Sequence, residues 1–184
     1  MLPIPPITSR REIAGNRFFS TIEEDLATAA GPYTYNFIES KWDAVIVVPV
    51  LPDGRLVIER IYRHPYRAYL HEFPAGGIEQ GEQPLIAAAR ELEEETGWRP
   101  GRCRVLGAFA PIPGLVRMRL HVVLAEELSQ TGARSQDAME LIEVEECTRE
   151  QAWTYAQTEQ ASAFLLQGLL LWEHSLGPVR STPG

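Results

Sequence analysis

Residues 90–97 read RELEEETG, so four glutamates occupy the five positions from 91 to 95. The residues just before them, PLIAAA from Pro84, are strong helix formers or suit a first helical turn. Gly97 suits the position just after a helix end. We therefore expect a helix over residues 84–96 that carries a concentrated negative charge.

The glutamates of this helix do not all face the same way. At 100° per residue, Glu91, Glu94 and Glu95 fall within about 100° of arc, whereas Glu93 points elsewhere and is expected to be a solvated charge. The apolar face that we expect to be buried comprises Leu85, Ala89 and Leu92. The helix is thus predicted to bury one side while it presents three carboxylates together on another.

Three neighbouring carboxylates repel one another, and a cation would compensate for this repulsion. Oxygen ligands of this kind suit Mg²⁺ or Mn²⁺. The helix alone does not decide between such a metal site and a plain solvated acidic face. The preceding stretch EFPAGGIEQGE, residues 72–82, holds glycines that permit a tight loop beside the acidic face, and its backbone carbonyls could add metal ligands.

The spacing across this loop and helix resembles the Nudix box. Gly76 is followed by five residues and Glu82, then by seven residues and RELEEETGW, which ends at Trp98. The resemblance implies an α+β fold, with a mixed β-sheet sandwiched between α-helices and an N-terminal antiparallel strand extension. It also implies an enzyme that uses Mg²⁺ or Mn²⁺ and water to cleave a nucleoside diphosphate linked to another group.

Site residues follow from the resemblance position by position. Glu91 and Glu95 are the expected main metal ligands, Glu94 is a further ligand or a base, and the Ala75 carbonyl is a backbone ligand. Structural roles within the box are expected for Gly76, Glu82, Arg90 and Gly97, with Glu82 and Arg90 paired.

Other features resemble the ADP-ribose pyrophosphatase branch, and the likeness runs over residues 17–175. They include IYRHP at residues 61–65, Pro113 sixteen residues after Gly97, and TREQAW followed by a long apolar helix. The branch implies substrate-binding roles for Arg63, Arg67 and Pro113. Where the branch often has an acidic residue after Pro-Gly, this chain has Arg117 and Arg119, which could favour a more anionic substrate or a different way of holding the sugar.

The branch also supplies a catalytic glutamate from a loop before its last strand. The expected position falls at or near Ala138, and Asp137 and Glu140 lie close to it. We choose Glu140 as the catalytic residue, with Asp137 as the alternative. If neither serves, the box glutamates must supply the base themselves.

The composition narrows the class of protein further. The chain has 184 residues, 45% of them hydrophobic, and a formal net charge of −8, which suits one domain with a small appendage and argues against nucleic-acid or anionic-membrane partners. Cys103 and Cys147 form no CxxC pair, so we expect free thiols in a reducing cytoplasm. No signal peptide is visible, and no apolar run is long enough to span a bilayer.

Elements outside the box are predicted from local patterns. Residues 1–16 are expected to be irregular, residues 32–40 a strand, and residues 42–50 and 55–63 a hairpin closed by LPDG. Residues 64–77 look like a loop. Further strands are expected at residues 103–110, 119–125 and 141–147, then a helix capped by Thr148 and Gln151, and a buried helix over residues 161–174. We expect residues 1–40 to form a strand-rich, dimerising extension and residues 41–184 the Nudix domain.

The leading hypothesis is a metal-dependent pyrophosphohydrolase that converts ADP-ribose, or a related nucleoside diphosphate sugar, to a nucleoside monophosphate and a sugar phosphate. The resemblance also implies a homodimer. One alternative is a hydrolase of a nucleoside triphosphate or a dinucleotide. Another is a noncatalytic sensor of a nucleotide sugar. An isoprenoid isomerase would need a suitably placed catalytic cysteine, which neither Cys103 nor Cys147 supports.

Overall fold

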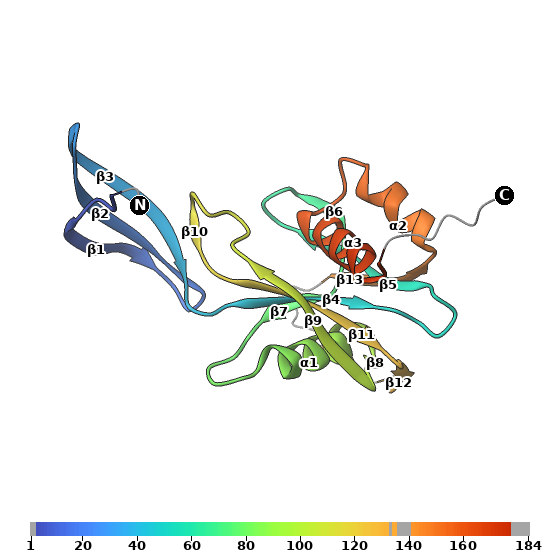
Figure 1. The fold of residues 1–184 in the computed structure, drawn as a ribbon. Coiled ribbons are helices and arrows are strands. Elements are labelled where there is room, and N and C mark those ends of the chain that lie inside the picture. The colour runs from blue at the N-terminus through green and yellow to red at the C-terminus, as the bar shows by residue number, and fades with distance from the viewer. Residues whose placement is uncertain (1–2, 133, 136–140, 178–184) are drawn as a thin grey trace. The chain divides into compact units, whose positions relative to one another are not determined.

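The structure, a computed structural model, describes residues 3–132, 134–135 and 141–177. The chain forms two compact units (Figure 1). The N-terminal unit comprises residues 1–43 and 109–120, and the main unit comprises residues 44–108 and 121–184. Each unit is described by itself.

The N-terminal unit is one sheet in the order β1-β2-β3-β10. Its strands are β1 (Ile7–Gly15), β2 (Phe19–Thr28), β3 (Gly31–Ser40) and β10 (Val116–Arg117). The first three are antiparallel, as expected for the extension, and β10 runs parallel to β3.

The prediction that residues 1–16 are irregular is wrong, because β1 occupies residues 7–15. Arg10 lies opposite Glu24 in the register of β1 and β2, and the two side chains form an ion pair of 2.5 Å. Arg11 and Glu23 are likewise opposite and paired. Opposite charges at facing positions stabilise a strand pair. The charges on β2 therefore stabilise a strand at residues 7–15, whose own sequence pattern does not predict one.

The main unit is built on two sheets and three helices. Its strands are β4 (Ala44–Pro49), β5 (Leu56–Arg63), β6 (Ala68–Glu72), β7 (Ala75–Gly77), β8 (Trp98–Arg99), β9 (Arg102–Phe109), β11 (Leu120–Glu126), β12 (Ser129–Gln130) and β13 (Ile142–Cys147). Its helices are α1 (Pro84–Thr96), α2 (Arg149–Ala156) and α3 (Ala163–Ser175). The two sheets have the strand orders β7-β4-β11-β9 and β13-β5-β6. In addition, β12 and β8 pair with each other as a small two-stranded sheet.

The hairpin predicted between residues 42–50 and 55–63 is wrong. Both strands exist, but β4 and β5 belong to different sheets, and an isolated bridge between Val50 and Leu56 lies where the chain turns from one to the other. The two edges of β4 are occupied by β7 and β11, so no edge is left for β5. The turn therefore passes the chain from one sheet to the other.

The loop predicted over residues 64–77 is also wrong in part, because it contains β6 and β7. Strand β6 pairs antiparallel with β5, and β7 pairs antiparallel with β4. The sequence AYLHE of β6 has no alternation of apolar and polar residues, and its last three residues are all buried, so the pattern gave no sign of a strand. These strands carry the chain from the β5–β6 edge to the start of α1.

Helices α1 and α3 cover opposite sides of β4 (Figure 1). Helix α1 packs on β4 and β7, whereas α3 packs on β4 and β6. A sheet between helices is the predicted α+β class, which is confirmed. Among the described residues, no helix has the length and apolar character needed to cross a membrane.

The ends of α1 and the burial of Leu92 agree with the prediction, but the rest of its buried face does not. Pro84 lies in the first turn, and Gly97 ends the helix in a left-handed conformation with φ of 76°. The buried apolar residues are Ala87, Ala88 and Leu92, whereas Leu85 is 38% exposed. The helical period defines possible faces, but the position of β4 and β7 decides which one is covered. Helix α2 has the predicted capping box of Thr148 and Gln151.

A close contact joins α3 to the segment that leads into β7. Phe73 is fully buried, and a Cβ added at Gly168 would overlap its ring, with 2.7 Å between the Cβ and the Phe73 Cε2 atom. Glycine therefore lets α3 approach Phe73 and Val48 directly. The phenyl ring is held two residues before Ala75, so α3 supports the chain just ahead of the box loop.

Candidate active site

The box loop and α1 are joined by the side chain of Arg90. Its Nε and Nη2 atoms donate to the two carboxylate oxygens of Glu82 at 3.0 and 2.9 Å, and Nη2 also donates to the Gly77 carbonyl at 2.9 Å. Two parallel hydrogen bonds between a guanidinium and a carboxylate are both strong and directional. This contact sets the loop against the helix, and it lowers the pKa of Glu82.

The same guanidinium contacts two glutamates of the helix. Its Nη1 atom donates to Glu91 at 2.7 Å and to Glu94 at 3.2 Å. The Glu91 carboxylate also lies directly on the backbone of Gly76, where any added Cβ would overlap it. Position 76 thus has to be glycine for Glu91 to occupy this place.

Glu95 is the most buried of the three glutamates on the acidic face, with 6% of its surface exposed. Its Oε2 atom accepts a hydrogen bond of 3.1 Å from the Ala75 N–H. Glu91 and Glu95 therefore lie against Gly76 and Ala75 of the loop, as the predicted face requires, and Glu94 contacts the same Arg90 guanidinium as Glu91. We call these three glutamates the glutamate face.

The donor set of the glutamate face fits the divalent cation that the box resemblance implies. Carboxylate and backbone carbonyl oxygens are the ligands that Mg²⁺ and Mn²⁺ prefer. Glu91, Glu94 and Glu95 are the side chains that would hold such an ion. Within the described ranges, no three His, Cys, Asp or Glu side chains already converge closely enough to bind a metal. In this structure Arg90 is the cation that Glu91 and Glu94 contact.

Glu93 lies away from the glutamate face, as predicted, but it is not simply solvated. Arg99 donates to its two oxygens at 3.0 and 2.6 Å. These hydrogen bonds lower the pKa of Glu93. The pair links the last turn of α1 to β8, a role that the helical period could not reveal.

Arg63 lies at the end of β5 and is paired with a buried acid. Its Nε and Nη2 atoms donate to the two oxygens of Glu72 at 2.9 and 2.7 Å. These hydrogen bonds are the largest cause of the raised pKa of Arg63, and the charges of Glu95 and Glu59 add to it. Arg67, in contrast, is exposed in the turn between β5 and β6, with a positive φ of 51°.

Two of these acids were not predicted as part of the site. Glu59 and Glu72 face each other across β5 and β6, and they are 1% and 3% exposed. A sequence signal was present for each: Glu59 interrupts the apolar strand LVIERIYR, and Glu72 lies three residues before Ala75. Buried charges are rare unless they are paired, so an acid at each of these positions indicates a paired and possible site residue.

Pro113 lies in the N-terminal unit, where it lines a cavity of about 880 Å³. Arg117, Arg119, Trp42 and Tyr35 line the same cavity. Arg117 forms an ion pair of 2.6 Å with Glu39. The Arg119 backbone N–H donates to Asp43 at 2.7 Å. Glu140 and Asp137, the candidates for the catalytic loop, lie outside the described residues.

Comparison with known proteins identifies the family. The model of the NUDIX domain matches residues 40–167. The chain belongs to the NUDIX family. The predicted resemblance and enzyme class, Nudix hydrolase, are thereby confirmed.

Two relatives match most of the chain. The ADP-ribose pyrophosphatase of Bacillus subtilis is 32% identical over 170 residues, which cover 90% of this chain and 92% of that protein. The CMP-5'-(N-acetyl-N-hydroxy-3-aminopropyl)phosphonate hydrolase of Streptomyces rubellomurinus is 30% identical over 95% of this chain and 84% of its own length.

A solved structure of an ADP compounds hydrolase superposes with a TM-score of 0.85 at 24% identity. The superposition covers 97% of this Nudix chain and 99% of the other. At this identity the likeness establishes the fold. The individual roles of the site residues stay predictions.

The first testable prediction concerns the pair of Arg90 and Glu82. Because the pair lowers the pKa of Glu82, its stabilisation is present above the unfolded-state value of about 4.3 and is lost as the pH falls through the lower folded-state value. Glu82→Gln should lower the free energy of unfolding by about 1–2 kcal/mol at pH 7. Urea denaturation at pH 7 and near pH 3.5 should show the difference from wild type shrinking at acid pH.

Glu79→Gln is the matched control, since Glu79 is exposed in the same loop. It should leave the unfolding free energy unchanged at both values of pH. An equal effect of the two substitutions would mean that the pair of Arg90 and Glu82 does not hold the loop.

Proposed function

We propose that this Nudix hydrolase is a metal-dependent pyrophosphohydrolase that cleaves ADP-ribose, or a closely related nucleoside diphosphate sugar, to AMP and ribose 5-phosphate. The observation that carries the proposal is the glutamate face, held beside the box loop by Arg90 and by the Ala75 N–H. The similarity to a curated ADP-ribose pyrophosphatase over nine tenths of the chain supports the choice of substrate.

The residues of the chain divide the work of this reaction. When bound, a divalent cation would neutralise diphosphate charge and lower the pKa of water. Glu91 and Glu95 are the proposed ligands, since the box loop already orients both carboxylates. Glu94 is the most exposed glutamate of the face, with 41% of its side chain accessible, so we propose it as the box residue that accepts a proton from water. Glu140 is the proposed alternative.

Arg63 supplies a second positive group near the glutamate face. Glu72 holds its Nε and Nη2 atoms in one plane, and the charge of Glu95 lies close enough to raise the pKa of Arg63. A guanidinium fixed in this way suits a phosphate oxygen. We therefore assign Arg63 to the phosphate of the substrate, whereas Arg67, exposed in the turn, is the weaker candidate.

A second candidate substrate is another nucleoside diphosphate or monophosphate derivative. The relative from Streptomyces rubellomurinus, whose name describes a CMP-linked phosphonate hydrolase, matches almost the whole chain at nearly the same identity. The common chemistry is a nucleotide joined to a second acidic group.

The first test of the proposed function is product analysis. The purified protein is incubated with Mg²⁺ or Mn²⁺ and with ADP-ribose, GDP-mannose, UDP-glucose, NADH, diadenosine polyphosphates or nucleoside triphosphates, and products are separated by chromatography. We expect AMP and ribose 5-phosphate from ADP-ribose ahead of all other products, and no turnover after chelation of the metal. Tight binding of one compound without turnover would instead support a sensor.

The glutamate face is tested by two neighbouring substitutions. Glu95→Gln removes a proposed ligand and should lower kcat by about 10²-fold or more, because metal ligation and charge both depend on the carboxylate. Glu93→Gln changes the same kind of residue on the other side of α1, where Arg99 is its partner, and should leave kcat near wild type. Circular dichroism should show both variants folded. Equal activities would contradict the assignment of the face.

We also propose that the enzyme is a cytoplasmic homodimer. All nine residues of β1 are exposed, and Ile7, Ile13, Phe18 and Tyr33 are each at least half exposed, an apolar surface that a partner could cover. Both cysteines are free, which suits a reducing compartment. Sedimentation equilibrium should give twice the chain mass of 20.6 kDa. A single-chain mass at micromolar concentration would contradict the dimer.

A further inference from the structure

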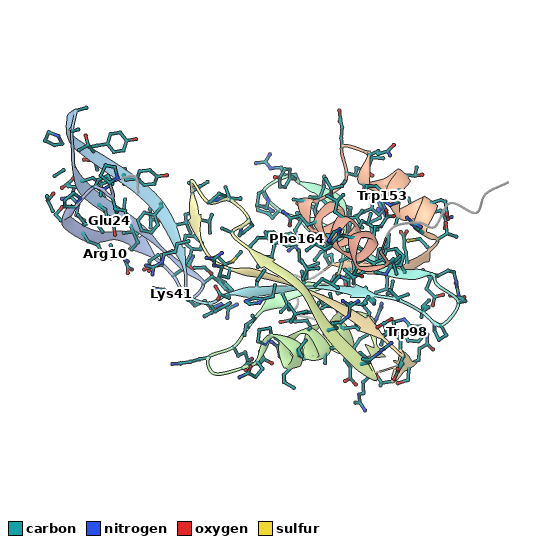
Figure 2. The ribbon with its side chains drawn as sticks, in the orientation of Figure 1. Arg10, Glu24, Lys41, Trp98, Trp153 and Phe164 are labelled. Carbon is teal, nitrogen blue, oxygen red and sulfur yellow. The ribbon has the colours of Figure 1, made fainter. Side chains whose placement is uncertain are left out.

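A second cavity lies in the main unit, between the end of the β5–β6 pair and the start of α3. Its volume is about 380 Å³. The lining comes from two stretches of chain about ninety positions apart, and it includes Arg63, Tyr66 and Leu70 from the first and Glu159, Ser162 and Phe164 from the second. Figure 2 labels Phe164 on α3.

The two stretches are joined by backbone hydrogen bonds, so the cavity is a built feature. The His71 N–H donates to the Gln160 carbonyl at 2.7 Å, and the Ser162 N–H donates to the His71 carbonyl at 3.1 Å. Segment 160–162 thus continues the sheet beyond β6. The walls of the cavity are therefore held by a strand and by a helix start.

The lining of this cavity is amphipathic. Leu70 and Phe164 supply apolar surface, and Tyr66, which is 72% exposed, supplies an aromatic ring at the rim. Glu159 is exposed and adds a carboxylate. The Ser162 hydroxyl accepts from the Phe164 N–H at 3.1 Å, so its own proton is available to another acceptor.

The Arg63–Glu72 pair connects the cavity to the glutamate face. Both residues line the cavity, and 37% of the Arg63 side chain remains exposed while Glu72 is almost wholly buried. On the other side, Glu72 precedes Ala75 by three residues, and the Ala75 N–H holds Glu95. A phosphate that contacts Arg63 would thus lie near the glutamate face, with the cavity available for the group that the phosphate carries.

We propose that this cavity binds the sugar half of the substrate, the group attached to the distal phosphate, and that Tyr66 and Glu159 help select it. The inference rests on the proposed function and adds to it the residues that recognise the sugar. Arg63 contacts the phosphate, the Tyr66 ring packs against the apolar face of the sugar, and Glu159 accepts hydrogen bonds from its hydroxyl groups.

The size and chemistry of the cavity favour a single sugar over a nucleoside. A volume of about 380 Å³ lies near the lower end of the range for ligand pockets, roughly 300–1,000 Å³, so it suits a monosaccharide better than a base joined to a ribose. Carboxylate and hydroxyl groups beside an aromatic ring also match a sugar, whose edge is polar and whose ring face is apolar.

The test compares the two halves of ADP-ribose as separate ligands. The dissociation constants of ribose 5-phosphate and of AMP are measured by calorimetry on the full-length protein with Mg²⁺. Tyr66→Ala and Glu159→Gln should each raise the dissociation constant of ribose 5-phosphate by about five- to tenfold, the loss expected from one ring contact or one hydrogen bond. The dissociation constant of AMP should not change.

Matched controls lie outside the cavity. Leu170→Ala also truncates a large exposed side chain, 53% accessible, and Glu143→Gln also neutralises an exposed carboxylate. Neither should change the dissociation constant of either half.

Three results would overturn the inference. If the substitutions weaken binding of AMP and not of ribose 5-phosphate, the cavity binds the nucleoside half. If they weaken binding of neither ligand, or of both equally, the cavity does not recognise the sugar. Because binding is measured directly, these outcomes differ from failure of the proposed function, which would appear as a wild-type protein that does not cleave ADP-ribose.

Discussion

The guanidinium of Arg90 is the interaction on which the site depends. One side chain contacts a loop carboxylate, a loop carbonyl and two helix carboxylates. Without a cation between them, the carboxylates of Glu82, Glu91 and Glu94 would repel one another, and the repulsion would be strong because they are partly shielded from water. The positive charge of Arg90 attracts all three, so the loop keeps a fixed position against α1. The position of Ala75 beside Glu95 then follows from it.

Much of the site was predictable because its chemistry is local in sequence. Pro84 and Gly97 predicted the two ends of the helix, and the resemblance to the Nudix box implied the pairing of Glu82 with Arg90; the structure has each of these. The wrong predictions concern partners that are distant along the chain. Residues 7–15 form a strand because β2 supplies the opposite charges, and Leu85 is exposed because β4 and β7 lie against another side of the helix.

The acids outside the box show why the rest of the site was harder to foresee. Glu59 and Glu72 become neighbours only when β5 and β6 pair, and Arg63 reaches Glu72 along one face of that pair. A single acid in an apolar strand indicates a buried charge, but its partner depends on strand register. The cavity beside Arg63 needs in addition the segment before α3, so no local pattern contains it. Glu140, the predicted catalytic residue of the loop, lies outside the described residues.

The contact between Phe73 and Gly168 has a consequence for synthesis on the ribosome. The box is complete in the nascent chain once Trp98 has been added, yet the ring that supports its loop lacks its covering helix until about seventy more residues have followed. Throughout that interval Phe73 would be left without the α3 surface that buries it. The box sequence is therefore synthesised well before the helix that completes its support. During that interval, a chaperone that binds exposed aromatic surface would protect the nascent chain.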